Sequence, residues 1–351
     1  MRSVIKGTGF AVGEHLVPNS RFEKIMDTSD QWIRERSGIE QRYFVADGTS
    51  TSDLGVRASR IALEQAGVAP HDIDYVVFAT MTPDHFFPGS GSLLQAKLGL
   101  RNIPALDIRQ QCTGFIYALQ ISDALLRSGV AKKILLVGAE THSPFMPFSD
   151  WETVLGLADR EPSPEDRAIH TQVRDRAVLF GDAGAAVVLE RNDEETERGL
   201  IDFELHTDGS NYNKLYVPSG MAHRPYVSPE ILKRLDHVPH MDGKHVFRMA
   251  VTKMPEVARS LLGRHGLTIS DVKMFIFHQA NLRINEAVQQ ALGIPPERIY
   301  NNIQRYGNTT AATIPIAYDE CRRSGKIKQG DLLCFVGLGA GFHWGAALLR
   351  D

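Results

Sequence analysis

The chain has 351 residues, 43% of them hydrophobic and 23% charged, which is the range of globular proteins with a large core. The formal net charge of -3 argues against nucleic acid as a partner, and no apolar run approaches the roughly 18 residues of a membrane span. Three cysteines without a CxxC pair argue against a disulfide framework and for a reducing, cytoplasmic location.

Short apolar runs rich in β-branched residues predict buried strands along the chain. The N-terminal stretch MRSVIKGTGFAVGEH is expected to be a strand that runs into a turn, and it lacks the apolar core of a signal peptide. Further strands are predicted at 75–81, 133–139, 184–190, 274–280 and 332–339. Because helix-length patterns that end near glycine separate these strands, we predict an α/β fold.

Cys112 follows the strand-like segment PALDIRQQ and begins a helical pattern that continues through Phe115 and Leu119. Most single cysteines are inert, buried residues. A helix N-terminus, however, carries a partial positive charge that lowers a thiol pKa, and strand ends face the cleft of a parallel α/β sheet. Cys112 is therefore a candidate nucleophile, whereas Cys321 in a predicted helix and Cys334 in a buried strand are expected to be structural.

Two segments interrupt the alternation of helices and strands. The first, 141–180, carries four prolines among many charges, and we interpret it as an insertion on the surface or over a pocket. The second, about 207–244, is rich in Gly, Pro, Tyr and His. Neither is biased enough in composition to be called disordered.

Two polar residues near the C-terminal end of the chain are candidates for the same site. His278 ends an apolar strand and precedes the polar cluster of Gln279, Asn281 and Arg283, although a histidine at a strand end is more often structural. Asn308 follows a glycine, where its ordinary role would be to cap a helix.

The glycine-rich stretch GLGAGFHWGAAL at 337–348 lacks both the P-loop and the dinucleotide-binding spacing. It is either a tight hairpin or a donor of backbone N–H groups to an oxyanion hole. His237, His240 and His245 cluster in a loop, but no second ligand group with zinc spacing accompanies them, so no metal is expected.

The two halves of the chain resemble each other. Residues 60–80 align with 259–279 at an offset of 199. Residues 112–129 align with 308–325 at an offset of 196, and these two segments both end in Arg-Ser-Gly. Two matches in the same order indicate an internal duplication. The second match makes Cys112 and Asn308 equivalent helix starts that face each other across a pseudo-two-fold axis.

Together the motifs C-T-G-F at 112–115, H-Q-A-N at 278–281, Y-G-N-T-T at 306–310 and G-A-G-F-x-W-G at 339–345 resemble the β-ketoacyl-[acyl carrier protein] synthase III family of the thiolase superfamily. MDTSDQWIRERSGIEQR at 26–42, FGDAGAAVVL at 180–189 and MDGKHVFRMAV at 241–251 extend the resemblance over nearly the whole chain. It implies a five-layered α-β-α-β-α core made of two duplicated halves. We place the halves at 1–195, with the insertion at about 141–180, and at 196–351.

The resemblance also implies a role for individual residues. Cys112, His278 and Asn308 match the catalytic triad, and the amides of Cys112 and Ala340 match the oxyanion hole. The remaining matches are Thr28, Trp32, Arg36, Gly243, Phe247 and Asn281 for coenzyme A and its pantetheine arm, Phe87 for the acyl pocket of a partner subunit, and Arg248 and Arg283 for the carrier protein. An adenine-stacking arginine matches either Arg174 or Arg176.

The implied enzyme is a cytoplasmic homodimer that needs no cofactor. Cys112 takes an acyl group from acyl-CoA, and decarboxylating condensation with malonyl-ACP or malonyl-CoA gives a 3-oxoacyl thioester. The alternatives are an acyltransferase that passes the acyl group to a hydroxyl or amine, a cysteine hydrolase, and a non-catalytic partner subunit. The C-G-[SA]-C-[WY] signature of papain-like hydrolases is absent, and the intact triad argues against a non-catalytic subunit.

Overall fold

Two mixed sheets form the frame of the computed structural model, which describes residues 2–193 and 197–351. The first sheet has the strand order β1 (Arg2–Val12), β7 (Ala183–Asn192), β6 (Lys133–Glu140), β4 (Tyr75–Ala79) and β5 (Ala105–Ile108). The second has the order β11 (Met274–Phe277), β12 (Leu332–Gly339), β13 (His343–Arg350) and β8 (Gly199–Thr207). In the first sheet, β4 pairs in parallel with β5 and β6. In the second sheet, β11 pairs in parallel with β12.

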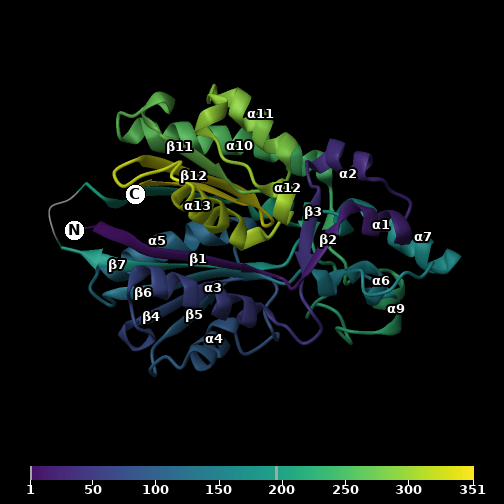
Figure 1. Ribbon diagram of the computed structural model, residues 1–351. Helices are drawn as coiled ribbons and strands as arrows, with labels where there is room; N and C mark the ends of the chain where they lie inside the picture. The colour runs from purple at the N-terminus through teal and green to yellow at the C-terminus, as the bar shows by residue number, and fades with distance from the viewer. Residues whose placement is uncertain (1, 194–196) are drawn as a thin grey trace.

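Helices cover both sheets in layers (Figure 1). α3 (Thr51–Ala66) and α4 (Ser90–Leu98) pack on the outer face of the first sheet, and α10 (Gly243–Arg264) and α11 (Leu282–Leu292) on that of the second. Between the sheets lie α5 (Gly114–Arg127) and α13 (Thr313–Arg323), whose apolar side chains join both sheets in one core. The expected five-layered α-β-α-β-α fold is confirmed.

The structural equivalence of the halves differs from the sequence match at the candidate site. The 3-10 turns η2 (Gln111–Thr113) and η7 (Thr310–Ala312) begin 199 positions apart, and their first residues share an unusual positive φ of 46° and 49°. The helices that follow, α5 and α13, have 14 and 11 residues, so their Arg-Ser-Gly ends lie 196 positions apart. Cys112 therefore corresponds to Ala311, and the predicted equivalence of Cys112 and Asn308 is wrong by three residues.

The two irregular segments are more ordered than their composition indicated. The 141–180 segment contains η3 (Ser143–Phe145), α6 (Trp151–Leu155), α7 (Pro164–Gln172) and α8 (Arg174–Ala177). The other contains η4 (Gly209–Lys214), β9 (Leu215–Tyr216), α9 (Pro229–Lys233) and β10 (His240–Met241). Residues of both segments pack against N-terminal elements or line a cavity. These elements are β2 (His15–Pro18), α1 (Asn19–Ile25), α2 (Asp30–Ser37) and β3 (Gln41–Phe44).

These elements form a lobe beside the layered core (Figure 1). Phe22 of α1 and Phe148 of the insertion meet in its apolar centre, with ring centroids 6.1 Å apart. Shorter connections complete the chain: η1 (Pro70–Asp72), η5 (Ile269–Asp271), η6 (Pro296–Arg298) and α12 (Ile303–Tyr306). Among the described residues no helix has the length and apolarity needed to cross a membrane. The expected boundary of the halves at 195/196 falls outside the described residues.

Candidate active site

A cavity of about 1090 Å³ lies where the lobe meets the core, and Cys112, His278, Asn308 and Ala340 all line it. These residues come from η2, the end of β11, the segment before η7 and the β12–β13 hairpin. Strand ends and helix starts from both sheets therefore converge on one space. The sequence predicted this convergence, although it assigned the wrong register to Asn308.

Cys112 sits in a tight backbone setting. A Cβ atom added to Gly339 would lie 2.7 Å from the Cys112 Cβ, so only glycine fits beside the thiol. The backbone N–H groups of Cys112 and Ala340 both donate to the sulfur. The glycine-rich stretch is thus a hairpin between β12 and β13, and its turn also supplies an amide to the sulfur. Two amides that meet at one sulfur have the arrangement of an oxyanion hole for a thioester carbonyl.

The expected lowering of the Cys112 pKa is not found. Burial raises the pKa of the thiol to about 12, and the nearby Glu140 carboxylate adds to the increase, while the two amides oppose it. Only 8% of Cys112 is exposed, so the loss of hydration outweighs the short η2 turn and the helix behind it. The resting group is a protonated thiol.

His278 is buried and neutral. It follows β11 directly, and its N–H donates to the Val336 carbonyl at 2.9 Å. Burial and, secondarily, the neighbouring His142 lower the pKa of the imidazole to about 3. Nδ1 lies 2.7 Å from the Thr313 hydroxyl, whereas Nε2 has no hydrogen-bond partner in the described part of the chain. His278 therefore leaves Nε2 available to a bound molecule.

Backbone bonds on both sides hold Asn308 in place. Its N–H donates to the Leu179 carbonyl at 2.8 Å, and its carbonyl accepts from the Gly181 N–H at 3.1 Å. Its side-chain Oδ1 accepts the Thr310 N–H at 2.9 Å, which leaves the Nδ2 donor without a hydrogen-bond partner in residues 2–193 and 197–351. The end of the 141–180 segment thus fixes the position of this carboxamide.

Two arginines contact the Trp32 ring. The guanidinium of Arg36 is 4.3 Å from the indole centroid, and that of Arg174 is 4.8 Å from it. Arg176 instead contacts Asp175 and the Gln172 carbonyl. Of the two alternatives left open by the sequence, Arg174 is the one placed against Trp32.

The other expected contacts divide into two groups. Gly243, Phe247, Asn281 and Arg283 line the cavity. Asn281 also donates to the Arg36 carbonyl at 2.8 Å, which ties α11 to α2. Thr28, Trp32, Arg36, Phe87 and Arg248 lie outside the cavity lining.

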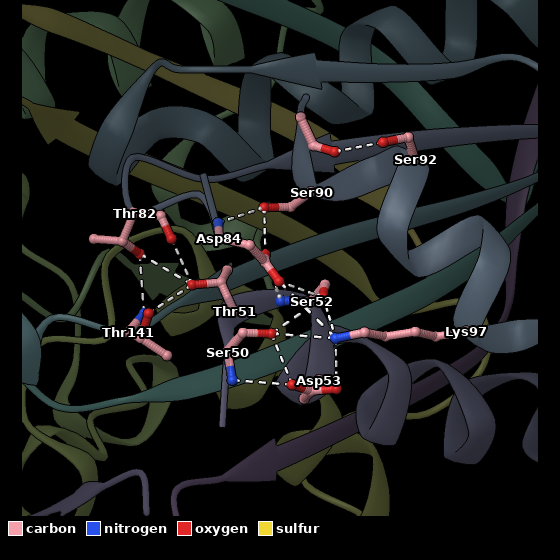
Figure 2. A network of polar contacts seen from close by, with 11 residues as sticks. Ser50, Thr51, Ser52, Asp53, Thr82, Asp84, Ser90, Ser92, Lys97 and Thr141 are labelled. Carbon is pink, nitrogen blue, oxygen red and sulfur yellow. Dashed lines mark hydrogen bonds and ion pairs between the residues drawn. The ribbon is translucent and has the colours of Figure 1, made fainter. Parts of the chain in front are cut away.

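Phe87 is 83% exposed, at the tip of the loop between β4 and α4, beside Phe86 of the cavity wall. A polar network holds the base of this loop (Figure 2). The Asp84 carboxylate accepts from the Ser52 N–H at 3.0 Å and from the Ser90 hydroxyl at 2.8 Å. Lys97 donates to Ser52 at 2.7 Å, so the base is fixed while the phenyl ring projects into solvent.

Several lining residues were not predicted. Tyr212, Tyr216 and Tyr226 of the 207–244 segment form part of the wall, and their only signal was the tyrosine content of an irregular stretch. No local motif indicates the neighbours of the candidate residues: Thr313 contacts His278, and Glu140 and His142 act on Cys112 and His278 through their charge. His237 also lines the cavity, and no group of three His, Cys, Asp or Glu residues in the described chain is placed to hold a metal.

Comparisons with known proteins agree with this geometry. Family models described as 3-oxoacyl-[acyl-carrier-protein] synthase III match residues 106–160 and 165–209, and the C-terminal model of that family matches residues 262–351. The β-ketoacyl-[acyl-carrier-protein] synthase III of Cereibacter sphaeroides is 41% identical over 353 residues, covering 100% of this chain and 99% of the relative.

Solved structures give the same result. That of 3-oxoacyl-(acyl carrier protein) synthase III from Pseudomonas aeruginosa is 35% identical with a TM-score of 0.85, covering 100% of this chain and 98% of that one. The Aquifex aeolicus enzyme of the same description is 36% identical with a TM-score of 0.84, covering 99% and 100%.

Proposed function

Since the chain belongs to the 3-oxoacyl-[acyl-carrier-protein] synthase III family of the thiolase superfamily, we propose a residue-level account of its reaction. The enzyme is an acyltransferase that condenses an acyl-CoA primer with malonyl-ACP in fatty acid synthesis. We assign the nucleophile to Cys112 and the two hydrogen-bond donors of the second step to His278 and Asn308. The assignment depends on one observation: two amides meet at the Cys112 sulfur in the cavity that His278 and Asn308 also line.

In the first step, the Cys112 sulfur attacks the thioester carbonyl of acyl-CoA. The carbonyl oxygen becomes an oxyanion that the Cys112 and Ala340 amides stabilise. When this intermediate collapses, the bond between the acyl carbon and the coenzyme A sulfur breaks. Coenzyme A leaves as a thiol, carrying the equivalent of the proton that Cys112 gave up.

In the second step, the malonyl thioester carbonyl accepts hydrogen bonds from His278 Nε2 and Asn308 Nδ2. Loss of carbon dioxide leaves an enolate, whose charge these two donors stabilise. The enolate carbon attacks the acyl group on Cys112, the carbon–sulfur bond breaks, and the released thiolate takes a proton from solvent. A neutral imidazole suits this role because a charged one would have to be buried.

The coenzyme A thioester enters as a substrate and no further cofactor is assigned. We place the adenine on Trp32 next to Arg174, with Arg36 directed to phosphate. Thr28, Gly243, Phe247 and Asn281 are assigned to the pantetheine arm, three of them because they line the cavity. We assign contacts with the acidic carrier protein to Arg283 and Arg248. Arg283 lines the cavity, and Arg248 lies one helical turn beyond Lys244, which also lines it.

We also propose a homodimer in the cytoplasm. β5 is the edge strand of the first sheet and pairs only with β4; its Leu106 is 36% exposed, and the neighbouring loop presents Phe86 and Phe87 to solvent. An apolar sheet edge of this kind is normally covered. A second copy that pairs along β5 would cover it and would place Phe87 at the acyl pocket of its partner.

Intact-protein mass spectrometry after incubation with a panel of acyl-CoAs tests the assignment. The wild-type protein should gain one acyl group, and Cys112→Ser should gain none. His278→Ala should keep the adduct but lose decarboxylation of malonyl-ACP by about 10²–10³-fold. If Cys112→Ser were acylated at the wild-type rate, the assignment of Cys112 as the nucleophile would be wrong. Product on a hydroxyl or amine acceptor without carbon dioxide release would favour the alternative acyltransferase.

A further inference from the structure

One turn of chain, Thr310–Thr313, contacts both proposed donors through their acceptor atoms. The Thr310 N–H binds Asn308 Oδ1 at 2.9 Å, and the Thr313 hydroxyl oxygen lies 2.7 Å from His278 Nδ1. In each side chain the remaining nitrogen, Nδ2 or Nε2, is left for the cavity. For Asn308 the orientation of the carboxamide follows, because the backbone N–H can only donate and therefore faces Oδ1. For His278 the position of the imidazole proton depends on whether Thr313 or Nδ1 donates.

The Thr313 hydroxyl has one proton and two neighbouring acceptors. Besides His278 Nδ1, the Thr310 carbonyl oxygen lies 3.0 Å from it. That carbonyl already accepts the backbone N–H of Thr313, so it stays satisfied without the hydroxyl. Nδ1 has no other partner within the described chain, and because the Thr310 carbonyl does not depend on the hydroxyl, the hydroxyl proton is free to turn towards Nδ1.

The distances favour the same assignment. Hydroxyl donors make short contacts, usually about 2.7–2.8 Å to an oxygen acceptor, whereas an N–H donor most often lies about 2.9–3.0 Å from an oxygen acceptor. The contact between Thr313 and His278, at 2.7 Å, matches a hydroxyl donor, and the 3.0 Å contact with Thr310 is the longer of the two. If Thr313 donates to Nδ1, the single proton of the neutral imidazole must be on Nε2.

We propose that Thr313 is a positioning residue for the condensation step: its hydroxyl donates to His278 Nδ1 and thereby fixes the tautomer that carries the proton on Nε2. This inference rests on the proposed function only for its consequence, because the malonyl carbonyl requires a donor at Nε2. The tautomer itself is a property of the free protein. Thr313 touches no substrate and acts only through His278.

A neighbouring contact keeps the turn in place. The Thr310 hydroxyl lies 2.7 Å from Nε2 of His142, whose Nδ1 faces the Gly181 carbonyl at 3.4 Å. A carbonyl can only accept, so His142 Nδ1 carries the proton and Nε2 accepts from Thr310. Thr310 therefore holds its positive φ of 49° while it presents its N–H to Asn308 and its carbonyl to Thr313.

The test compares three substitutions of buried threonines. Thr313→Val keeps the shape but removes the hydroxyl, and Thr313→Ser keeps the hydroxyl. Thr309→Val is the matched control, because the Thr309 hydroxyl is equally buried and has no partner among the described residues. We expect Thr313→Val to lower kcat for decarboxylation by about 10–100-fold with little change in KM, whereas Thr313→Ser and Thr309→Val stay close to wild type.

Acyl-adduct formation separates a tautomer effect from misfolding. Thr313→Val should still take the acyl group on Cys112, because the nucleophile and its two amides lie on other elements. Loss of the adduct together with decarboxylation in Thr313→Val, with both kept in Thr309→Val, would contradict a role confined to His278. An unchanged kcat in Thr313→Val would overturn the proposal.

Nitrogen NMR of protein labelled with ¹⁵N-histidine reads the tautomer directly, without any substrate. The His278 signals are identified by their absence from the His278→Ala spectrum. We expect a protonated Nε2 and a bare Nδ1 in the wild-type protein and in Thr313→Ser, and a changed pattern in Thr313→Val. A protonated Nδ1 in the wild type would overturn the proposal. If the expected tautomer is seen but no condensation occurs with any acyl-CoA, the proposed function fails and the tautomer assignment stands.

Discussion

At the scale of single residues, the Cys112 thiol is set by opposing effects of its surroundings. Its own amide and that of Ala340 favour the thiolate, while burial and the Glu140 carboxylate favour the thiol and prevail. Glu140 is itself buried at the end of β6, where it accepts the Thr82 hydroxyl at 2.6 Å and the Thr82 N–H at 3.1 Å. We propose that the same two amides, which do not ionise the resting sulfur, stabilise the oxyanion that forms when the sulfur attacks the thioester.

The pH dependence of Cys112 alkylation follows from this balance. With a thiol pKa of about 12, the reactive thiolate should increase about tenfold per pH unit through pH 8–10, without a plateau. Burial raises the pKa of Glu140 to about 7, so this group gains its charge near neutrality, which opposes thiol ionisation and flattens the rise there. Peptide mapping after iodoacetamide treatment measures the rate. A plateau below pH 8 would contradict the raised pKa.

The sequence predicted the three candidate residues because each stands next to a local signal: Cys112 at a helix start, His278 at a strand end and Asn308 after a glycine. It did not predict Glu140 or Thr313, whose roles arise from contacts 28 and 35 positions along the chain from Cys112 and His278. The expected low thiol pKa was wrong because a sequence shows the helix start but not the depth of burial.

At the scale of elements, the insertion is part of the site rather than a surface decoration. Its last helix, α8, brings Arg174 against Trp32 of α2, and the following residues hold Asn308 through the Leu179 and Gly181 backbone.

The register of the two halves is also decided at this scale. α13 is three residues shorter than α5, so a match anchored on the common Arg-Ser-Gly ends misplaces the helix starts, and only the structure shows the difference.

Substitution of the two neighbouring arginines tests the role of α8. Arg174→Ala should raise KM for acyl-CoA several-fold and leave kcat almost unchanged, because we propose that Arg174 stacks on the adenine beside Trp32, and a cation–π contact of this kind contributes about 0.5–2 kcal/mol. Arg176→Ala is the matched control, since its contacts are with Asp175 and Gln172. Steady-state kinetics over a range of acyl-CoA concentrations measures both. Equal KM values for the two variants would contradict the assignment of Arg174.

At the scale of the whole molecule, the layered core and the lobe have separate tasks. The core brings strand ends and helix starts from both halves to one point, and its layers follow from the alternating pattern of the sequence. The lobe contributes aromatic residues to the wall of the cavity. The sequence predicted the core because its periodicity is regular, but the lobe is held by contacts between short segments far apart in the chain, such as that between Phe22 and Phe148.

The exposed loop beside β5 gives a prediction about assembly. Phe87→Asp should shift the protein from dimer towards monomer, because it would bury a charge where we propose that an apolar side chain meets the partner. Leu157→Asp is the control, since Leu157 is 65% exposed on the lobe and remote from β5. Sedimentation velocity measures the change. A wild-type protein that sediments as a monomer at micromolar concentration would contradict the dimer.

The three-residue difference between the helix starts makes the two copies unequal in chemistry. Ala311, a methyl group with nothing to donate or accept, stands where its twin carries the sulfur. The first copy carries the sulfur, and in the second copy Thr310 and Thr313, on either side of Ala311, contact Asn308 and His278 instead. The two copies therefore differ in chemistry within one equivalent turn, η2 in the first and η7 in the second.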